Sequence, residues 1–123
     1  MKSSTSWLLK LPESLQTAAY RAVGEAAWPA KEALAVLASA GRLDIAICGV
    51  EVWLPTTPGP TIPTPYFYHW SGEAREAGEG WTEFVRRMNA AAARYIRDFK
   101  WDPNDRAHQG LEAYFNLDAV SEY

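Results

Sequence analysis

The chain has 123 residues, a formal net charge of -3 and an apolar share of 48%, which predicts one folded domain with its own core and excludes a disordered chain. This mildly acidic balance gives no reason to expect binding to nucleic acid or to an anionic membrane surface. Cys48 is the single cysteine, which excludes an internal disulfide and suits a reducing compartment. The apolar patch at residues 7–9 is too short for a signal peptide, and no run approaches the ~20 residues of a membrane span. We therefore expect a cytoplasmic protein.

The first third of the chain predicts helices after a polar lead-in. Residues 1–10 are expected to be frayed. Apolar residues at helical spacing predict a helix over residues 12–28, with a proline at its first position. Pro29 ends this helix and begins a second one over residues 29–41. Gly41 stands where a glycine can terminate a helix.

The middle of the chain predicts strands. Residues 43–54 are rich in β-branched and aromatic side chains, and Gly49 among them indicates a bulge or a close backbone approach. The prolines of residues 55–65 exclude helix and central strand, and they favour an exposed connection with polyproline II character. Residues 66–70 then predict an aromatic strand, antiparallel to the first.

The last third contains the most regular pattern. Residues 81–99 place Trp, Phe, Val, Met and Ile side chains on one face at helical spacing. A short helix is expected over residues 102–108, and residues 114–117 form either a strand or a segment packed on the core. We therefore predict an α+β fold, a small antiparallel sheet packed against three to four helices, in a single domain over residues 1–123.

Candidate chemical groups are sparse. His69 and His108 have no other ligand at metal-binding spacing, so no metal site and no cofactor site is predicted. Cys48 stands in an apolar strand, where a buried and inert thiol is the favoured interpretation. An enzymatic alternative stays open, in which Cys48 pairs with His69 or Glu51 pairs with His69.

Charge separates along the C-terminal half. Residues 81–101 are mainly basic outside their apolar face, and residues 102–123 are mainly acidic. An RNA-binding helix is one interpretation of the basic face, but the chain has no recognised RNA motif. The favoured interpretation is an exposed face that also contacts the acidic C-terminal segment.

Aromatic and acidic residues on either side of the proline segment predict a protein-binding surface. Trp and Tyr often supply most of the energy of an interface, and surrounding carboxylates can steer a basic partner. An alternative is that a small sheet buries both of its faces. The predicted partner-binding residues are Glu51, Trp53, Tyr66, Tyr68, Trp70, Glu73 and Glu76.

Five short stretches carry a resemblance to a known family. They are KEAL at 31–34, IAICGVEVW at 45–53, YHW at 68–70, WTEFV at 81–85 and ARYIRDF at 93–99. In order and spacing they resemble the bacterial immunity proteins of polymorphic toxin systems, in particular immunity protein family forty. The chain departs from that pattern at residues 48–51, where the family is expected to have two glycines and an acidic residue, and in its proline-rich insert.

The resemblance implies a protein that acts by binding. It implies no catalytic residues and no cofactor, and it implies a stoichiometric inhibitor of a cognate toxin domain. A regulatory binding module without a toxin and the small enzyme described above are the alternatives. No individual contact residue follows from the resemblance.

Overall fold

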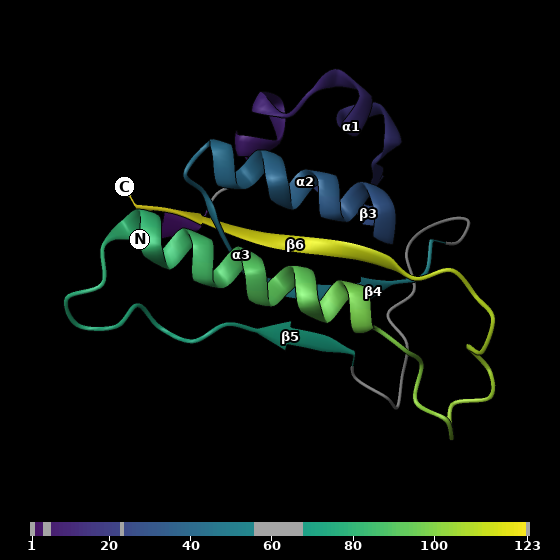
Figure 1. Ribbon diagram of the computed structural model, residues 1–123. Helices are drawn as coiled ribbons and strands as arrows, with labels where there is room; N and C mark the ends of the chain where they lie inside the picture. The colour runs from purple at the N-terminus through teal and green to yellow at the C-terminus, as the bar shows by residue number, and fades with distance from the viewer. Residues whose placement is uncertain (1, 4–5, 23, 56–67, 123) are drawn as a thin grey trace.

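The computed structural model describes residues 2–3, 6–22, 24–55 and 68–122. It confirms the α+β class, with three α-helices and an antiparallel sheet (Figure 1). In chain order the elements are β1 (Lys2–Ser3), the 3-10 helix η1 (Ser6–Lys10), α1 (Glu13–Ala18), β2 (Tyr20–Ala22), β3 (Glu25–Pro29), α2 (Ala30–Arg42), β4 (Ala46–Trp53), β5 (His69–Ser71), α3 (Trp81–Asp98) and β6 (Tyr114–Ser121).

The last strand lies in the middle of the sheet. The strand order is β2-β3-β6-β4-β5, and β1 pairs with the C-terminal end of β6. All pairings are antiparallel, and β6 bonds to β3 on one side and to β4 on the other. The sheet therefore joins the two ends of the chain, because β6 is flanked by strands from the first half.

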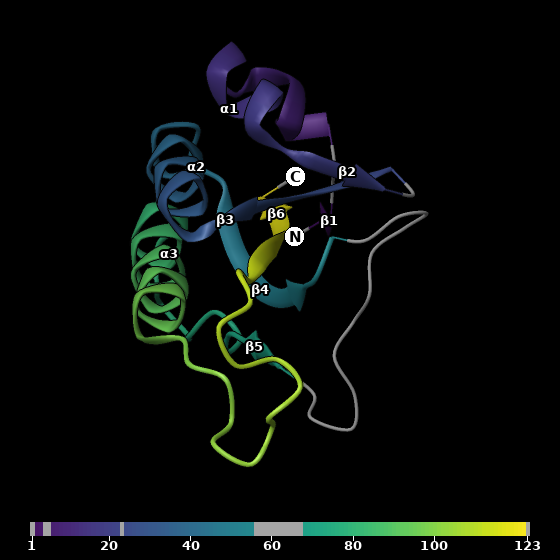
Figure 2. The same ribbon diagram turned by 90° about the vertical axis from the view of Figure 1, so that its right-hand side faces the viewer.

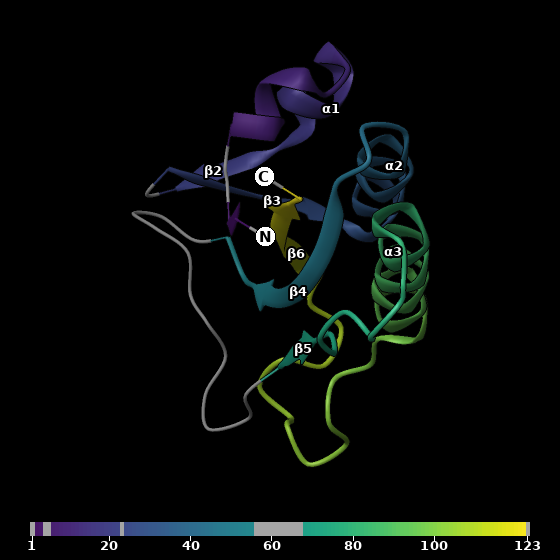
Figure 3. The same ribbon diagram turned by 90° about the vertical axis from the view of Figure 1, so that its left-hand side faces the viewer.

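The helices cover one face of this sheet. Side chains directly opposite in an antiparallel pair share a face, so the row Trp28, Phe115 and Val52 faces one way. These side chains form the main core with α2, α3 and the N-terminal helices. Figures 2 and 3, which look along the strands from opposite ends, show α2 and α3 together on this side.

The opposite face carries a different row of side chains. Tyr20, Ala27, Asn116, Glu51 and His69 are paired across the five strands, so their side chains share this face. We call it the outer face. Among the described residues, no helix packs against it.

Helix α3 confirms the predicted amphipathic helix almost to the residue. Its apolar stripe, including Phe84, Met88 and Ile96, is buried. The polar Asn89 side chain of α3 also points to the sheet. The Asn89 Oδ1 accepts from the Ile47 N–H at 2.7 Å, and its Nδ2 donates to the Ile45 carbonyl at 3.1 Å. The side chain thus provides hydrogen-bond partners for backbone groups at the start of β4, where β5 does not pair.

The helix predicted over residues 12–28 is wrong beyond its first turns. It ends at Ala18, and residues 20–22 and 25–29 form the paired strands β2 and β3, with Gly24 at a φ of 78° before β3. The alanine-rich sequence fits both periodicities, because alanine has almost no side chain to bury. Pairing of Trp28 opposite Phe115 in the core decides in favour of the strand.

The expected frayed lead-in is wrong for residues 6–10. They form η1, whose Trp7 and Leu8 are buried. The Trp7 ring packs against the Trp28 ring at 6.4 Å, and the Trp28 Nε1–H donates to the Leu15 carbonyl at 2.8 Å. A tryptophan contact thus fastens the N-terminal segment to the sheet.

Helix α2 and the strands β4 and β5 confirm their predictions, except that residues 66–67 of the predicted second strand lie outside the described residues. Gly41 lies inside α2, and Asp44, at a φ of 58°, takes the left-handed position after the helix instead. The pairing of β4 with β6 shifts register between Ile47 and Gly49, which confirms the predicted bulge. The prediction for residues 56–65 lies outside the described residues.

Of the two predictions for the C-terminal segment, one is wrong and one is confirmed. The short helix over residues 102–108 is wrong, because these residues form consecutive turns. The Asp102 Oδ1 accepts from the Asn104 N–H at 2.8 Å, so Asp102 caps a turn. The strand alternative for residues 114–117 is confirmed and extends to Ser121. In the described ranges, no helix has both the length and the apolar character required to cross a bilayer.

We expect Asn89→Ala to lower the free energy of unfolding by about 2 kcal/mol, because it removes two hydrogen bonds to the half-buried margin of β4. Urea denaturation followed by tryptophan fluorescence measures this change. Arg86→Ala, on the exposed face of α3, is the matched control and should stay within about 0.5 kcal/mol of the parent. Equal effects of the two substitutions would contradict the role of Asn89.

Candidate functional site

The residues predicted to form one partner-binding surface lie on both faces of the sheet at β5. Trp70 lies opposite Val50 and shares the helix-covered face, whereas His69 lies opposite Glu51 on the outer face. Glu51 and Trp53 therefore point away from the side to which Trp70 points. The prediction of a single surface is wrong for these residues, because side chains alternate along a strand. Tyr66 lies outside the described residues.

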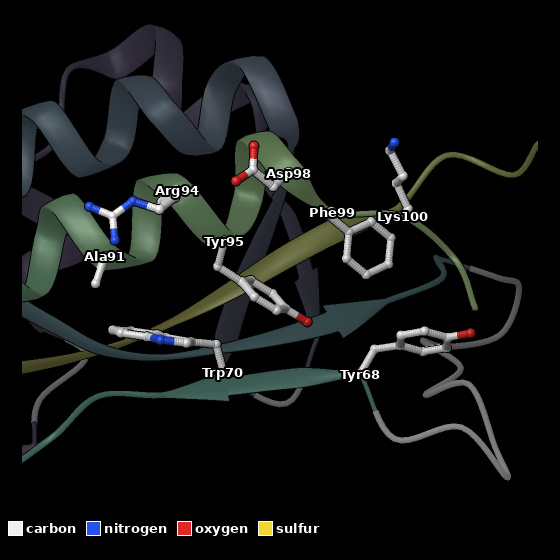
Figure 4. A pocket seen from close by; sticks show the side chains of 8 residues that line it. All are labelled: Tyr68, Trp70, Ala91, Arg94, Tyr95, Asp98, Phe99 and Lys100. Carbon is white, nitrogen blue, oxygen red and sulfur yellow. The ribbon is translucent and has the colours of Figure 1, made fainter. Parts of the chain in front are cut away.

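On the helix side, β5 and the C-terminal half of α3 enclose an aromatic groove. It has a volume of about 490 Å³. Figure 4 shows aromatic rings along it, with Arg94, Asp98 and Lys100 around them. The residues that line the aromatic groove are Tyr68, Trp70, Ala91, Arg94, Tyr95, Asp98, Phe99 and Lys100.

The rings of the aromatic groove pack against further aromatic side chains that connect them to the core. Tyr68 and Trp101 each meet Phe99 edge-on, at ring-centroid distances of 5.6 and 5.0 Å. Phe99 in turn packs against the buried Phe115 at 5.5 Å. Edge-to-face contacts of this kind stabilise aromatic pairs beyond their buried area. The aromatic wall is thus continuous with the core.

A polar clasp fixes Tyr68. Its hydroxyl donates to the Asp105 Oδ2 at 2.7 Å and accepts from the Asp102 N–H at 3.0 Å. The His108 Nδ1 lies 2.7 Å from both carboxylate oxygens of Asp105. Asp105 is only 4% exposed, so its charge depends on these partners. We call Tyr68, Asp105 and His108 the polar clasp.

The hydrogen bonds of the polar clasp favour the ionised form of Asp105. Burial by itself raises the pKa of this carboxyl, but the hydrogen bonds from Tyr68 and His108 outweigh burial and lower it. Burial and the bond to Asp105 raise the pKa of Tyr68. A charged carboxylate therefore accepts from a neutral phenol at neutral pH, and the turns of residues 102–110 are held against β5.

Tyr95, Arg94 and Lys100 supply further polar groups at the aromatic groove. Burial raises the pKa of Tyr95 to about 12, so its phenol is neutral. Arg94 and Lys100 are exposed, and neither belongs to an ion pair within the described part of the chain. In the described part of the chain no ion pair joins the basic helix face to the acidic C-terminal segment, although Arg97, Lys100 and Glu112 line one concavity. Arg87 pairs with Glu79 at 2.8 Å, while Glu122 pairs with Arg75 at 3.3 Å.

The outer face contains a second concavity, which we call the acidic hollow. Its volume is about 370 Å³. Glu51 and His69 are directly opposite in the β4–β5 pairing, and so are Gly49 and Ser71. Asp118 lies opposite Gly49 on β6. The residues that line the acidic hollow are Glu25, Gly49, Val50, Glu51, His69, Trp70, Ser71, Asn116 and Asp118.

Trp53 does not present an aromatic surface. It is 3% exposed, and its Nε1–H donates to the Glu51 Oε1 at 2.8 Å. Tyr20 meets the Trp53 ring edge-on at 6.4 Å and the Tyr114 ring at 6.4 Å. The prediction of Trp53 as an exposed anchor is wrong, since its ring is already packed. Its contribution is to orient Glu51.

Cys48 lies apart from His69. The thiol packs against the α3 cluster that contains Phe84 and Met88, and Cys48 is not among the residues that line the acidic hollow. Burial and the nearby Asp118 carboxylate raise the pKa of Cys48 to about 11. A thiol with this pKa is protonated at neutral pH and is a poor nucleophile. Of the two pairs considered for an enzymatic site, the fold brings Glu51 and His69 together and leaves Cys48 elsewhere.

The loop between β5 and α3 holds the remaining predicted residues. Glu73 and Glu76 are exposed. The Glu76 N–H donates to the Glu79 Oε1 at 3.0 Å, and Arg87 bonds to both Glu79 oxygens at 2.8 Å. Hydrogen bonds from Arg87 lower the pKa of Glu79 to about 2. Within the described segments, no group of His, Cys, Asp and Glu side chains is arranged to hold a metal.

Sequence reasoning missed most residues of both concavities. Arg94, Tyr95 and Phe99 were assigned to a helix, and their proximity to β5 follows from packing. Glu25 and Asp118 are far apart in sequence and meet only through the β3–β6 pairing. Alternation along residues 114–121 could have placed Asn116 and Asp118 on one face. No sequence signal joins that face to Glu25.

Comparison of the chain with protein-family models, with curated proteins and with solved structures finds no match.

We expect the Cys48 thiol to react slowly with a disulfide reagent in the folded protein at pH 8. A pKa of about 11 leaves a thiolate fraction roughly a hundredfold below that of a free cysteine. Stopped-flow absorbance in buffer and in 8 M urea compares the folded and unfolded rates. Equal rates in the two conditions would show that Cys48 is exposed and reactive.

The polar clasp should make stability fall in acid. Because the pKa of Asp105 is lowered by folding, its contribution is complete above the ordinary carboxyl pKa of 3.8 and is lost as the pH falls through the folded value. Urea midpoints at pH 7 and pH 3 should therefore differ less in Asp105→Asn than in the parent. Glu13→Gln, at an exposed position, should retain the parental difference, and the same behaviour in both variants would contradict this assignment.

Proposed function

We propose that the chain is an immunity protein that binds a cognate bacterial toxin domain and neutralises it by stoichiometric inhibition in the cytoplasm. The resemblance of residues 31–99 to immunity proteins motivates this proposal. The observation that carries it is the aromatic groove, in which tryptophan, tyrosine and arginine side chains meet. These three residue types are enriched among the residues that contribute most to protein interfaces.

The groove suits an apolar side chain of the toxin. Tyr68 and Phe99 are held in place by the polar clasp and by the core. Because these rings are already ordered, binding loses little side-chain entropy there. Arg94 and Lys100 outnumber Asp98 at the rim, which favours an acidic residue of the toxin beside the inserted side chain. Tyr68 and Trp70 stay in the proposed contact surface.

The other predicted contact residues have a narrower role in this proposal. Glu51 belongs to the outer face, across the β5 edge from the aromatic groove. Glu73 and Glu76 are exposed in the following loop and supply charge. A toxin domain seated over the edge of β5 contacts both faces, because β5 contributes Trp70 to one and His69 to the other.

A small enzyme that uses Glu51 and His69 is the second candidate. Their opposition across β4 and β5 within one concavity favours it. The Cys48–His69 version has no comparable support, because Cys48 packs elsewhere. Glu51→Gln and His69→Gln would abolish catalysis but only weaken binding, which separates this candidate from an inhibitor.

Co-expression tests the inhibitor proposal. The toxin domain encoded beside this chain should arrest growth alone, and co-expression of this chain should restore growth through a one-to-one complex. Arg94→Glu should weaken the complex at least tenfold, because it reverses charge at the aromatic groove. Isothermal titration calorimetry measures the dissociation constant.

Arg86→Glu is the matched control, since it makes the same charge change on the exposed face of α3 away from the groove. It should change the dissociation constant less than twofold. Persistent toxicity with no complex would overturn the proposed function. Equal weakening by the two variants would overturn the groove as the contact surface.

A further inference from the structure

Strand β5 forms one edge of the sheet. It pairs with β4 on one side, and among the described residues no strand pairs with its other side. Figure 1 shows β5 below α3, at the margin of the sheet. The backbone N–H and C=O groups of an edge strand can pair with a strand from another chain. A second chain can therefore extend the sheet at β5.

The hydrogen bonds of β5 show which of its backbone groups point outward. The Val52 N–H donates to the Tyr68 carbonyl at 3.2 Å, and the Gly72 N–H donates to the Cys48 carbonyl at 2.8 Å. In an antiparallel pair, residues that bond to the neighbouring strand alternate with residues that do not. The backbone N–H and C=O of Ser71 therefore point away from β4. Ser71 is exposed, and within the described part of the chain neither of these groups has a hydrogen bond.

The aromatic groove lies directly beside this edge. Trp70, the residue before Ser71, lines the groove. An antiparallel strand added along β5 places its residue opposite Ser71 on the outer face and the next residue, opposite Trp70, on the helix-covered face. That second side chain reaches the groove, where Arg94 and Lys100 lie around the aromatic rings (Figure 4). Backbone pairing and the groove can thus bind the same segment.

We propose that the partner protein adds an extended segment to β5 as an antiparallel strand. The identity of this partner, the toxin domain, rests on the proposed function. Backbone hydrogen bonds supply the affinity in this mode of recognition, and pockets for alternate side chains supply the specificity. Ser71 provides the backbone donor and acceptor. The aromatic groove selects an apolar side chain followed, two residues later, by an acidic one.

Charge at the edge favours a different protein over a second copy of this chain. Glu51 and Asp118 lie on the outer face near β5, and Arg94 and Lys100 lie at the aromatic groove. Two copies joined through β5 would bring each of these sets toward its own equivalent, and like charges repel. A segment with basic side chains on one face and apolar and acidic side chains on the other meets opposite charge on both sides.

A peptide tests strand addition without the toxin. The octapeptide TKTKFKET, acetylated and amidated at its ends, has Phe and Glu on one face of a strand and its lysines on the other. Titrated into the ¹⁵N-labelled full chain at pH 7.5, it should shift the amides of Trp70, Ser71 and Gly72 most. The permuted peptide TKTFKKET has the same composition but places Phe and Glu on opposite faces, and it should bind at least fivefold more weakly.

Methylation of the peptide backbone separates strand pairing from contacts of side chains alone. N-methylation of the fourth residue, the lysine opposite Ser71, removes a donor aimed at β5 and should weaken binding at least tenfold. N-methylation of the fifth residue, the phenylalanine, removes an N–H that points away from β5 and should change binding less than threefold. Equal weakening by the two methyl groups, or no shift at Ser71 with millimolar peptide, would overturn strand addition.

The complex with the toxin domain gives a second measurement at the same backbone groups. Hydrogen exchange of the Ser71 amide in the unsubstituted chain should slow at least tenfold on binding. Ser71→Pro removes the outward N–H and no hydrogen bond to β4, so it should weaken the complex at least tenfold. Ser71→Ala keeps the N–H and should change the dissociation constant less than twofold. Spectra unchanged away from residues 70–72 verify that both variants fold.

The outcomes distinguish strand addition from the proposed function. Peptide binding with the alternating effect of methylation, but without a toxin complex, would support strand addition and overturn the proposed function. Toxin neutralisation with a Ser71 amide that stays unprotected would overturn strand addition alone. A dimer of the free chain that Ser71→Pro dissociates would assign the edge to a second copy and would also overturn strand addition by the toxin.

Discussion

The pairing of β6 between β3 and β4 is the constraint on which the rest of the structure depends. Phe115 on β6 lies between Trp28 and Val52, so one strand completes the core row that the helices cover. The same strand places Asn116 and Asp118 on the outer face. Without β6, the β2–β3 hairpin and the β4–β5 pair share no hydrogen-bonded neighbour. Core and outer face are therefore assembled together, once the last strand of the chain is inserted.

Consecutive residues of strand β5 belong to two different surfaces, the aromatic groove and the acidic hollow. Trp70 joins the aromatic groove because it shares a face with Val50, and His69 joins the acidic hollow because it shares a face with Glu51. The physical basis is the alternation of side chains along a strand. A protein partner at this edge can meet apolar rings on one side and carboxylates on the other.

Packing that supports the fold also supports the candidate site. The polar clasp attaches the turns after α3 to Tyr68, and Tyr68 is at the same time a wall of the aromatic groove. Arg87 and Glu79 likewise attach the loop before α3 to the helix. Both ends of α3 are thereby tied to neighbours of β5. The concavities thus lie between elements whose relative positions are held by hydrogen bonds as well as by the core.

The sequence by itself determined the elements with one strong periodicity. Residues 81–99 could only be an amphipathic helix, and the β-branched residues around Gly49 predicted a bulged strand, because large apolar side chains must share a face to be buried. It did not determine residues 19–29, whose alanines fit a helix or a strand until Trp28 meets Phe115. It also did not reveal the roles of Asn89 or Asp105, because their partners are distant backbone and side-chain groups. The acidic hollow was decided by tertiary structure alone, since only the strand order brings Glu25, Glu51 and Asp118 to one place.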